Sequence, residues 1–284
     1  MNRGVLALEC PDVKGVVAAV STLLADQDLT ITEASQFNDA PARRFFMRAA
    51  FESVGAEPLD LVTLKETFAA IGDRFSMRWL IEDGDYQPRV FIGVSRLGHC
   101  LYDLIHRWRA GILPVDIVGV FSNHDDMRGF VEWNGLPYFH LPIAPLTKSE
   151  QERRLLALIS EFQADLVVLA RYMQILSPSL CSALSGRCIN IHHSFLPSFR
   201  GARPYHQAYA RGVKIIGATA HYVTTELDEG PIIEQGVERV GHGQTAEDFV
   251  KIGRDIETTV LARAVRWHAE KRVMVSGNRT VIFD

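Results

Sequence analysis

The stretch Cys188-Ile-Asn-Ile-His-His-Ser-Phe-Leu-Pro-Ser-Phe-Arg-Gly-Ala-Arg203 decides how the larger part of this chain is interpreted. It begins as a short apolar strand, in which Asn190 and His192 are two positions apart and therefore project from the same face. Polar side chains at the end of an apolar strand are typical of ligand sites in α/β folds. His221 and Asp228 follow shortly after. An amide, imidazoles and a carboxylate form a set suited to polarising a carbonyl and moving protons around it.

The composition indicates a soluble globular protein of one large or two ordinary domains. The chain has 284 residues, of which 47% are hydrophobic and 23% are charged. A net charge of −4 argues against nucleic acid or a membrane surface as a partner bound through bulk charge. Four cysteines without a CxxC pair predict free thiols in a reducing compartment. With no apparent signal peptide or membrane span, we expect a cytoplasmic protein.

The first part of the chain predicts a small α/β sandwich in the order βαββαβ, with its helices on one face. The expected strands are Gly4–Leu8, Leu29–Phe37, Arg43–Glu52 and Phe75–Ile81, and the expected helices are 15–27 and Leu59–Ile71. Polar residues with Gly84 and Pro88 then mark a linker at 84–88. The predicted domains are therefore residues 1–83 and 89–284.

The second part predicts a Rossmann-like, doubly wound α/β sheet, because short runs of almost entirely apolar residues alternate with helical segments. The runs are Val90–Val94, Ile117–Phe121, Leu166–Ala170 and Cys188–Ile191, and the helical segments lie near 98–110, 124–133, 149–163 and 176–185. Later strands are expected at Ile216–Val223 and Ile232–Val240, followed by a long helix from Thr245 to about Lys271. Thr245 has the side chain of a good N-cap.

Three interpretations compete for the polar set formed by Asn190, His192, His193, His221 and Asp228. The residues can be hydrogen-bonding groups of the core, although five in one Gly- and Pro-rich region are many for that role. A zinc site is the second interpretation, but adjacent histidines on a strand point to opposite faces, and no HxH or HExxH pattern is present. The third is metal-free acyl chemistry on a small carbonyl, which this set favours.

Residues 3–82 resemble the ACT domain family. The resemblance depends on Cys10-Pro-Asp-Val-Lys-Gly15 and on Arg44-Phe-Phe-Met-Arg48. It implies a ferredoxin-like module that pairs into a homo-oligomer and binds a small amino acid as effector, with glycine or methionine as candidates. A plain dimerisation module without a ligand remains open.

Residues 88–284 resemble the folate-dependent formyltransferase family. The shared motif is Asn190-Ile-His192 with Ser194 and Leu196-Pro197, followed by His221 and, seven residues later, Asp228. The resemblance implies that Asn190, His192 and Asp228 are the catalytic residues and that Leu196–Pro197 is a cis bond. It implies 10-formyltetrahydrofolate as the substrate, with no metal and no further cofactor.

The loop after the first strand of this part helps to choose between water and an amine as the acceptor. A phosphate cradle for a phosphorylated amine needs a loop rich in small residues, but Gly93-Val-Ser-Arg-Leu-Gly-His-Cys100 has two glycines among bulky residues. Ser95, Arg96 and Gly98 remain able to hold an anion. The full motif resembles the branch that hydrolyses 10-formyltetrahydrofolate to formate and tetrahydrofolate, which supplies formate for purine synthesis and balances one-carbon pools. Transfer to an amine stays the alternative.

The resemblance also places the rest of the substrate. The pterin is expected against Met173, Gln174, Ile175 and Leu176, in a loop that can equally be a plain strand-to-helix turn. Lys148 and Arg171 are candidates for the carboxylates of the folate glutamate, or else solvated surface charges. His193 is expected to orient the substrate or a neighbouring group, and His221 to position Asp228 or water.

Overall fold

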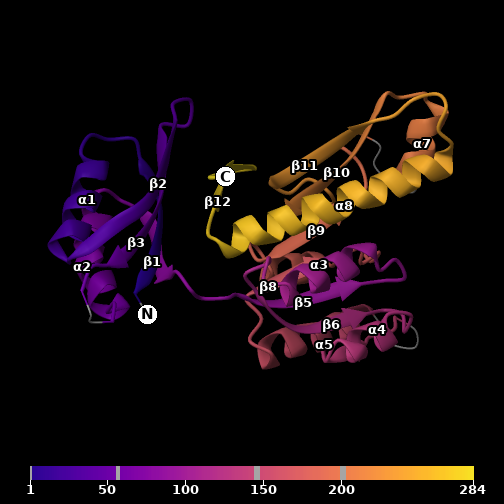
Figure 1. The fold of residues 1–284 in the computed structure, drawn as a ribbon, viewed down its shortest axis with the longest axis horizontal. Helices are drawn as coiled ribbons and strands as arrows, with labels where there is room; N and C mark the ends of the chain where they lie inside the picture. Colours follow the sequence, from indigo (N-terminus) through magenta and orange to yellow (C-terminus); the bar gives the residue numbers. More distant parts are fainter. Residues whose placement is uncertain (1, 56–57, 144–147, 199–202) are drawn as a thin grey trace. The chain divides into compact units, whose positions relative to one another are not determined.

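The structure is a computed structural model that describes residues 2–55, 58–143, 148–198 and 203–284. It divides into two compact units (Figure 1). Unit 1 contains Met1–Tyr86 together with Glu270–Met274 and Val281–Asp284, and unit 2 contains Gln87–Ala269 and Val275–Thr280. Residues 199–202 of the opening motif lie outside the described residues.

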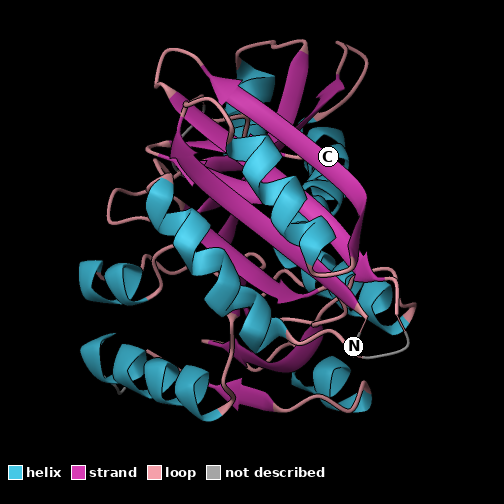
Figure 2. Cartoon of the chain, turned by 90° about the vertical axis from the view of Figure 1, so that its left-hand side faces the viewer, coloured by secondary structure: helices cyan, strands magenta, loops and turns pink. Residues whose placement is uncertain are grey.

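Unit 1 has the predicted βαββαβ order. Its elements are β1 (Arg3–Pro11), α1 (Val16–Asp26), β2 (Leu29–Asp39), β3 (Arg44–Ser53), α2 (Leu61–Arg74) and β4 (Arg78–Asp83). The strands form a sheet in the order β2-β3-β1-β4, with antiparallel pairs throughout. In Figure 2 the helices of this unit pass in front of its strands. Leu6 and Leu8 of the sheet share one buried cluster with Leu24 of α1 and Phe68 of α2.

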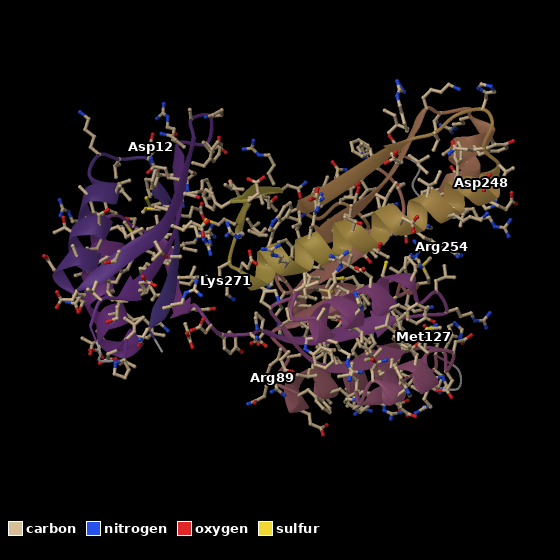
Figure 3. The ribbon with its side chains drawn as sticks, viewed as in Figure 1. Asp12, Arg89, Met127, Asp248, Arg254 and Lys271 are labelled. Atoms are coloured by element: carbon tan, nitrogen blue, oxygen red, sulfur yellow. The ribbon has the colours of Figure 1, made fainter. Side chains whose placement is uncertain are left out.

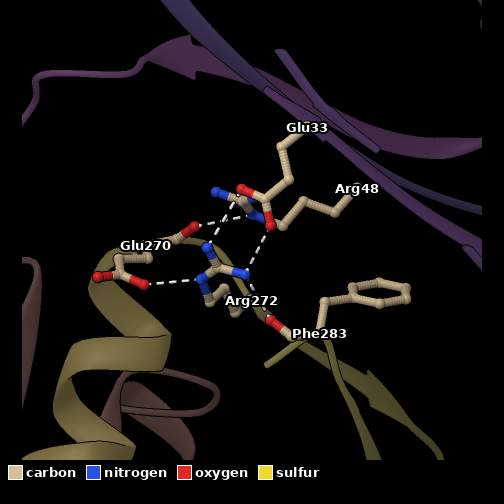
Figure 4. A network of polar contacts seen from close by, with 5 residues as sticks. All are labelled: Glu33, Arg48, Glu270, Arg272 and Phe283. Atoms are coloured by element: carbon tan, nitrogen blue, oxygen red, sulfur yellow. Dashed lines mark hydrogen bonds and ion pairs between the residues drawn. The ribbon is translucent and has the colours of Figure 1, made fainter. Parts of the chain in front are cut away.

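The face of this sheet that is turned away from the helices carries a buried charge. Arg48 of β3 is 4% exposed, and its Nη1 lies 3.0 Å from Glu33 Oε2 on β2. Arg272, from the end of the chain, binds the same carboxylate through Nη1 at 2.9 Å. The carbonyl of Glu270 accepts a bond from Arg48, and that of Phe283 accepts one from Arg272 (Figure 4). The last residues of the chain are thus an integral part of unit 1.

The end of the chain differs from the expectation of a helix that runs to Lys271. Helix α8 ends at Ala269, and the strands β12 (Val273–Ser276) and β13 (Arg279–Ile282) follow as a hairpin. The turn between them contains Gly277, which has a φ of 61° that few other residues adopt. The predicted range 89–284 therefore did not anticipate that residues 270–274 and 281–284 group with unit 1.

Unit 2 is built on a sheet of seven strands in the order β11-β10-β9-β8-β5-β6-β7. The strands are β5 (Arg89–Val94), β6 (Asp116–Ser122), β7 (Tyr138–His140), β8 (Leu166–Leu169), β9 (Cys188–His192), β10 (Ile215–Tyr222) and β11 (Ile232–Arg239). The helices are α3 (His99–Arg109), α4 (Arg128–Trp133), α5 (Lys148–Glu161), α6 (Pro178–Ala183), α7 (Pro204–Ala210) and α8 (Ala246–Ala269). Strands β5 to β9 pair in parallel, as predicted, whereas β10 and β11 are antiparallel. Strand β7 and helix α7 were not foreseen.

Helices cover both faces of the seven-stranded sheet. Val167, Leu169 and Cys188 belong to one buried cluster with Leu155 of α5 and Leu180 of α6. Because neighbouring residues of a strand point to opposite faces, we call this face the α5–α6 face and its opposite the α8 face.

Helix α8 packs on the α8 face of the sheet. The hydroxyl of Tyr222, on β10, lies 2.7 Å from Nδ1 of His268 on α8. At the other end of the helix, the backbone N–H of Asp248 donates to the Thr245 hydroxyl, and the N–H of Thr245 donates to the Asp248 carboxylate. These reciprocal bonds confirm the predicted start of α8, near which Figure 3 labels Asp248.

All four cysteines are free and buried, in agreement with the composition. Among the described residues, the helices are too short or too polar to cross a bilayer.

A pair of glycine substitutions tests how tightly the sheet of unit 2 is packed. A methyl group at Gly93, in the central strand β5, would collide with the ring of Phe121. We expect Gly93→Ala to lower the free energy of unfolding by about 1–3 kcal/mol. Gly129 of α4 has open space around it, so Gly129→Ala should raise that free energy by up to about 1 kcal/mol. Calorimetric melting of both variants checks this, and equal effects of the two would contradict it.

Candidate active site

Strands β9 and β10 bring the polar residues of the opening motif together. Asn190 and His221 are directly opposite each other in the antiparallel register of the two strands. Nδ2 of Asn190 lies 3.2 Å from Nε2 of His221, whose Nδ1 lies 2.9 Å from the Tyr222 carbonyl. A carbonyl can only accept, so Nδ1 carries the hydrogen and Nε2 accepts from the amide of Asn190. The backbone of β10 thereby fixes which way the amide of Asn190 points.

Asp228 stands between the two histidines. Its Oδ1 lies 3.3 Å from Nδ1 of His192 and 3.7 Å from Nε2 of His221. The residue belongs to the loop between β10 and β11 and has a φ of 57°, which turns the chain back toward the end of β9. A non-glycine residue in this left-handed region is uncommon and often marks a functional turn.

The environment of Asp228 keeps its carboxylate ionised. Burial acts to raise the pKa of the group, but the hydrogen bond from His192 and the neighbouring ring of His221 together outweigh it and hold the pKa well below its usual range. The carboxylate is therefore a fixed negative charge near neutral pH. Such a group can orient a water molecule or an imidazolium and can accept a proton from water as the water attacks.

His192 has one nitrogen left for a substrate. Nδ1 is directed to Asp228, whereas Nε2 is buried and has no hydrogen-bond partner among the described residues. A buried polar atom without a partner costs free energy unless a ligand satisfies it. Since His192 lines the main cavity of unit 2, Nε2 is available to a ligand there.

That cavity has a volume of about 820 Å³, which lies within the range of sites that bind small molecules. It is lined by nine of the residues singled out from the sequence: Met173, Gln174, Ile175, Leu176, Asn190, His192, His193, His221 and Asp228. Met173 and Ile175 are 54% and 62% exposed, so the loop between β8 and α6 presents apolar surface to a ligand. The bond Leu196–Pro197 is cis, as the resemblance implies.

Lys148 lies beside the main cavity. It is the first residue of α5 and lines a neighbouring cavity of about 330 Å³, together with Gln174, Ile175 and Leu176. The loop is thus common to both cavities. A ligand against the loop in the first cavity can extend a negatively charged tail toward the second.

Ser95 holds this loop in place. Its hydroxyl donates to Asn123 at 2.7 Å and accepts from the backbone N–H of Met173 at 2.9 Å. The same residue donates its own N–H to the carbonyl of Arg171. The expectation that Ser95 can hold an anion does not fit, because these bonds already use its hydroxyl.

A second group of polar residues lines the same cavity, and of its members only Arg171 was singled out from the sequence. Glu257 of α8 accepts from the hydroxyl of Tyr205 at 2.8 Å and lies 2.8 Å from Nε2 of His99. Arg171 Nε lies 3.4 Å from the same carboxylate. Arg171 is only 7% exposed, so it is not a solvated surface charge. A glutamate within the apolar stripe of α8 was the signal available in the sequence.

His193 lies between the two groups. Its ring is 5.3 Å from that of His192 and 6.3 Å from that of Tyr205, measured between centroids. Burial, aided by the charge of Arg171, lowers the pKa of His193 to about 3. The ring is therefore neutral at physiological pH.

A metal ion does not fit the closest cluster of possible ligands. Among the described residues, that cluster is His99, Cys100 and Glu257. Burial raises the pKa of the Cys100 thiol well above its ordinary value, so it stays protonated and is a poor ligand. The guanidinium of Arg171 already compensates the charge of Glu257.

Comparison with known proteins assigns the chain to a family. Residues 88–265 match the family model described as formyl transferase. A formyltetrahydrofolate deformylase from Corynebacterium sp. (strain P-1) is 50% identical over 99% of this chain and 98% of its own length.

Solved structures agree with this assignment. The crystal structure of a formyltetrahydrofolate deformylase from Pseudomonas syringae pv. tomato is 51% identical, with a TM-score of 0.96, over 100% of this chain and 95% of that one. A glycinamide ribonucleotide transformylase from Symbiobacterium toebii is 32% identical, with a TM-score of 0.67, over 71% of this chain and 96% of that one. With relatives of one kind matched at about half of all positions over the whole chain, this protein belongs to the formyltetrahydrofolate deformylase family.

Proposed function

We propose that this protein hydrolyses 10-formyltetrahydrofolate to formate and tetrahydrofolate. The observation that carries the proposal is the Asp228 carboxylate, which faces His192 and His221 in a cavity whose other wall is the apolar loop of residues 173–176. Such an arrangement suits attack of water on a formyl group held at the end of a flat, largely apolar substrate. The formate released would supply purine synthesis and balance one-carbon pools, in the cytoplasm.

In the proposed mechanism the formyl oxygen receives hydrogen bonds from Asn190 and His192. When both nitrogens of His192 carry hydrogen, Nδ1 donates to Asp228 and Nε2 donates to the oxygen as it becomes negative. Donors that are already in position cost no reorganisation when the charge develops, which makes them effective in a buried site. His221 acts on the substrate only through the amide of Asn190, whose direction it sets.

Asp228 accepts a proton from the attacking water and passes it to the leaving nitrogen. Water adds to the formyl carbon while one of its protons moves to the carboxylate, which relays it to N10 as the bond between carbon and nitrogen breaks. Because its pKa is held low, Asp228 gives the proton up readily. The second proton of the water leaves on formic acid, which ionises to formate and a proton in solution, so the products are formate, a proton and tetrahydrofolate. We propose that no metal takes part, and treatment with a chelator should leave turnover unchanged.

Transfer of the formyl group to an amine is the second candidate. It is supported by the similarity of unit 2 to the glycinamide ribonucleotide transformylase fold. The two candidates are distinguished by the product, which is free formate in one case and a formylated amine in the other.

We propose further that unit 1 is an ACT domain that joins copies of this chain into a homo-oligomer and binds a small amino acid, glycine or methionine. A cavity of about 430 Å³ lies at the turn between β1 and α1, lined by Asp12, Gly15 and Asn38. The amide of Asn38 donates to the Asp12 carboxylate at 2.8 Å, which places a polar pair beside exposed backbone. This geometry supports binding of a molecule with both an ammonium and a carboxylate.

Asp228→Asn should lower kcat by about 10²–10⁴ and leave folate binding little changed, since the shape is kept and the proton carrier is lost. Steady-state release of formate and equilibrium binding of tetrahydrofolate measure the two effects. With the pKa of Asp228 held low, its carboxylate stays ionised as the pH falls from 8 to 5. Any loss of wild-type activity over that interval therefore arises from another group and should persist in the residual activity of the variant. Normal turnover of this variant would refute the assignment.

Lys148→Ala should raise KM about two- to fivefold and leave kcat unchanged, because an exposed ion pair with a folate carboxylate contributes to binding alone. Arg153→Ala, on the same helix α5 and 74% exposed, is the matched control. Equal KM values for the two variants would show that Lys148 does not contact the substrate.

Glycine or methionine should change the turnover of the full chain, and Asn38→Ala should raise the concentration that produces half of this effect at least threefold while basal turnover stays the same. An effector shifts activity only if it binds two states of the enzyme differently. Turnover measured across a concentration series of each amino acid provides the test. If the full chain responds to neither, plain dimerisation remains as the role of unit 1.

A further inference from the structure

The buried charges around Glu257 form a closed set, which we call the Glu257 cluster: His99, Arg171, Tyr205 and Glu257. Its members come from the start of α3, the loop just after β8, α7 and the middle of α8. All four line the cavity that contains His192 and Asp228. In the hydrolysis described above, none of them touches the formyl group or moves a proton.

The cluster pairs a buried carboxylate with a buried guanidinium, although Nε of Arg171 has no hydrogen-bond partner among the described residues. Glu257 is 1% exposed. Burial acts to raise its pKa, but the hydrogen bonds from His99 and Tyr205 and the charge of Arg171 outweigh it and lower the pKa. The ionised carboxylate therefore anchors the Arg171 guanidinium. The ring of Tyr205 lies against the bare backbone of Gly253, where a methyl group would collide with it. These contacts leave the cluster little freedom to move aside for a ligand.

The Glu257 cluster and the loop of residues 173–176, which we call the folate loop, lie toward different faces of the sheet. Asn190 and His192 are two and four positions after Cys188 on β9, so all three side chains point toward the α5–α6 face. Leu176 of the folate loop packs against the same cluster of side chains. His193 points the other way, and there its ring meets Tyr205, while Glu257 approaches from α8. The Glu257 cluster thus lines the part of the cavity on the α8 face.

This division restricts an acceptor to the α8 side of the cavity, which the side chain of Arg171 borders. A folate bound against residues 173–176 occupies the α5–α6 part of the cavity, so the substituent of any attacking amine has only the α8 part. Water has no substituent and needs only about 30 Å³.

The backbone of Arg171 singles out this residue within the cluster. Its φ of 65° is the left-handed conformation that glycine adopts most easily, and a side chain at such a position is held under strain. The ion pair with Glu257 offsets that strain. A large cationic side chain is therefore present at a position whose backbone conformation favours glycine.

On the basis of the proposed hydrolysis, we propose that Arg171, anchored by Glu257 and enclosed by His99 and Tyr205, blocks the α8 side of the cavity against amines and thereby selects water as the acceptor. Arg171 and Glu257 are in this role specificity-determining residues. Exposed Arg254, one turn before Glu257 on α8 and labelled in Figure 3, lies at the border of the same region and is not part of the block.

The test is the ratio of formylated amine to formate when the enzyme turns over 10-formyltetrahydrofolate in the presence of hydroxylamine, methylamine or glycinamide. In Arg171→Gly, which suits the backbone and removes the cation, this ratio should rise at least tenfold for glycinamide. Gln163→Gly is the matched control, because Gln163 is exposed and also has a positive φ, of 47°. The control should keep the wild-type ratio.

Loss of Arg171 leaves Glu257 buried without its cation, which can unfold the protein. The double variant Arg171→Gly/Glu257→Gln removes the charge as well, and the same rise is expected in it. The wild-type enzyme supplies a further measurement that needs no variant. Its rate of formylation should fall steeply from hydroxylamine to methylamine to glycinamide, after correction for the reactivity of each amine in solution.

Two results would overturn the proposal. One is a folded variant that still produces formate and has an unchanged product ratio. The other is a wild-type enzyme whose corrected formylation rates do not depend on amine size. A wild-type enzyme that produces no formate at all would instead refute the hydrolytic function itself, so the two failures are distinguishable.

Discussion

The carboxylate of Asp228 is the charge on which the geometry of the site depends. It lies within 3.3 Å of His192 and 3.7 Å of His221, and His221 in turn fixes the amide of Asn190. Two conditions in the fold make this possible. The left-handed turn at Asp228 directs the loop back over the sheet, and the antiparallel register sets His221 opposite Asn190. Without either condition, the carboxylate of Asp228 would not lie close to both His192 and His221.

Two carboxylates in one cavity, those of Asp228 and Glu257, both have a lowered pKa but have different roles. Burial raises the pKa of both Asp228 and Glu257, and in both cases hydrogen bonds and nearby positive charge reverse the effect. Around Asp228 the partners are imidazoles, one of which keeps a nitrogen free for a ligand. Around Glu257 the carboxylate is enclosed by its partners and accepts from a phenol, so we assign it a restraining role and not a chemical one.

The sequence predicted whatever depends on local periodicity. Asn190 and His192 were placed on one face because side chains alternate in a strand, and the start of α8 was found because Thr245 has the side chain of a good N-cap. Pairing between distant strands has no such local signal, so the antiparallel direction of β10 was not predicted. The role of Glu257 was missed for the same reason, since its partners come from three other elements.

The return of the last residues to unit 1 has a consequence for how the protein is made. Arg272 meets Glu33 across 239 positions of the chain, and the carbonyl of Glu270 is a partner of buried Arg48. While a ribosome is still synthesising the chain, the strands of unit 1 can pair and its helices can pack, but the positive charge of Arg48 has only part of its final environment. The module that is translated first is therefore completed last, and a chain released early would carry its defect in the opening third of the molecule.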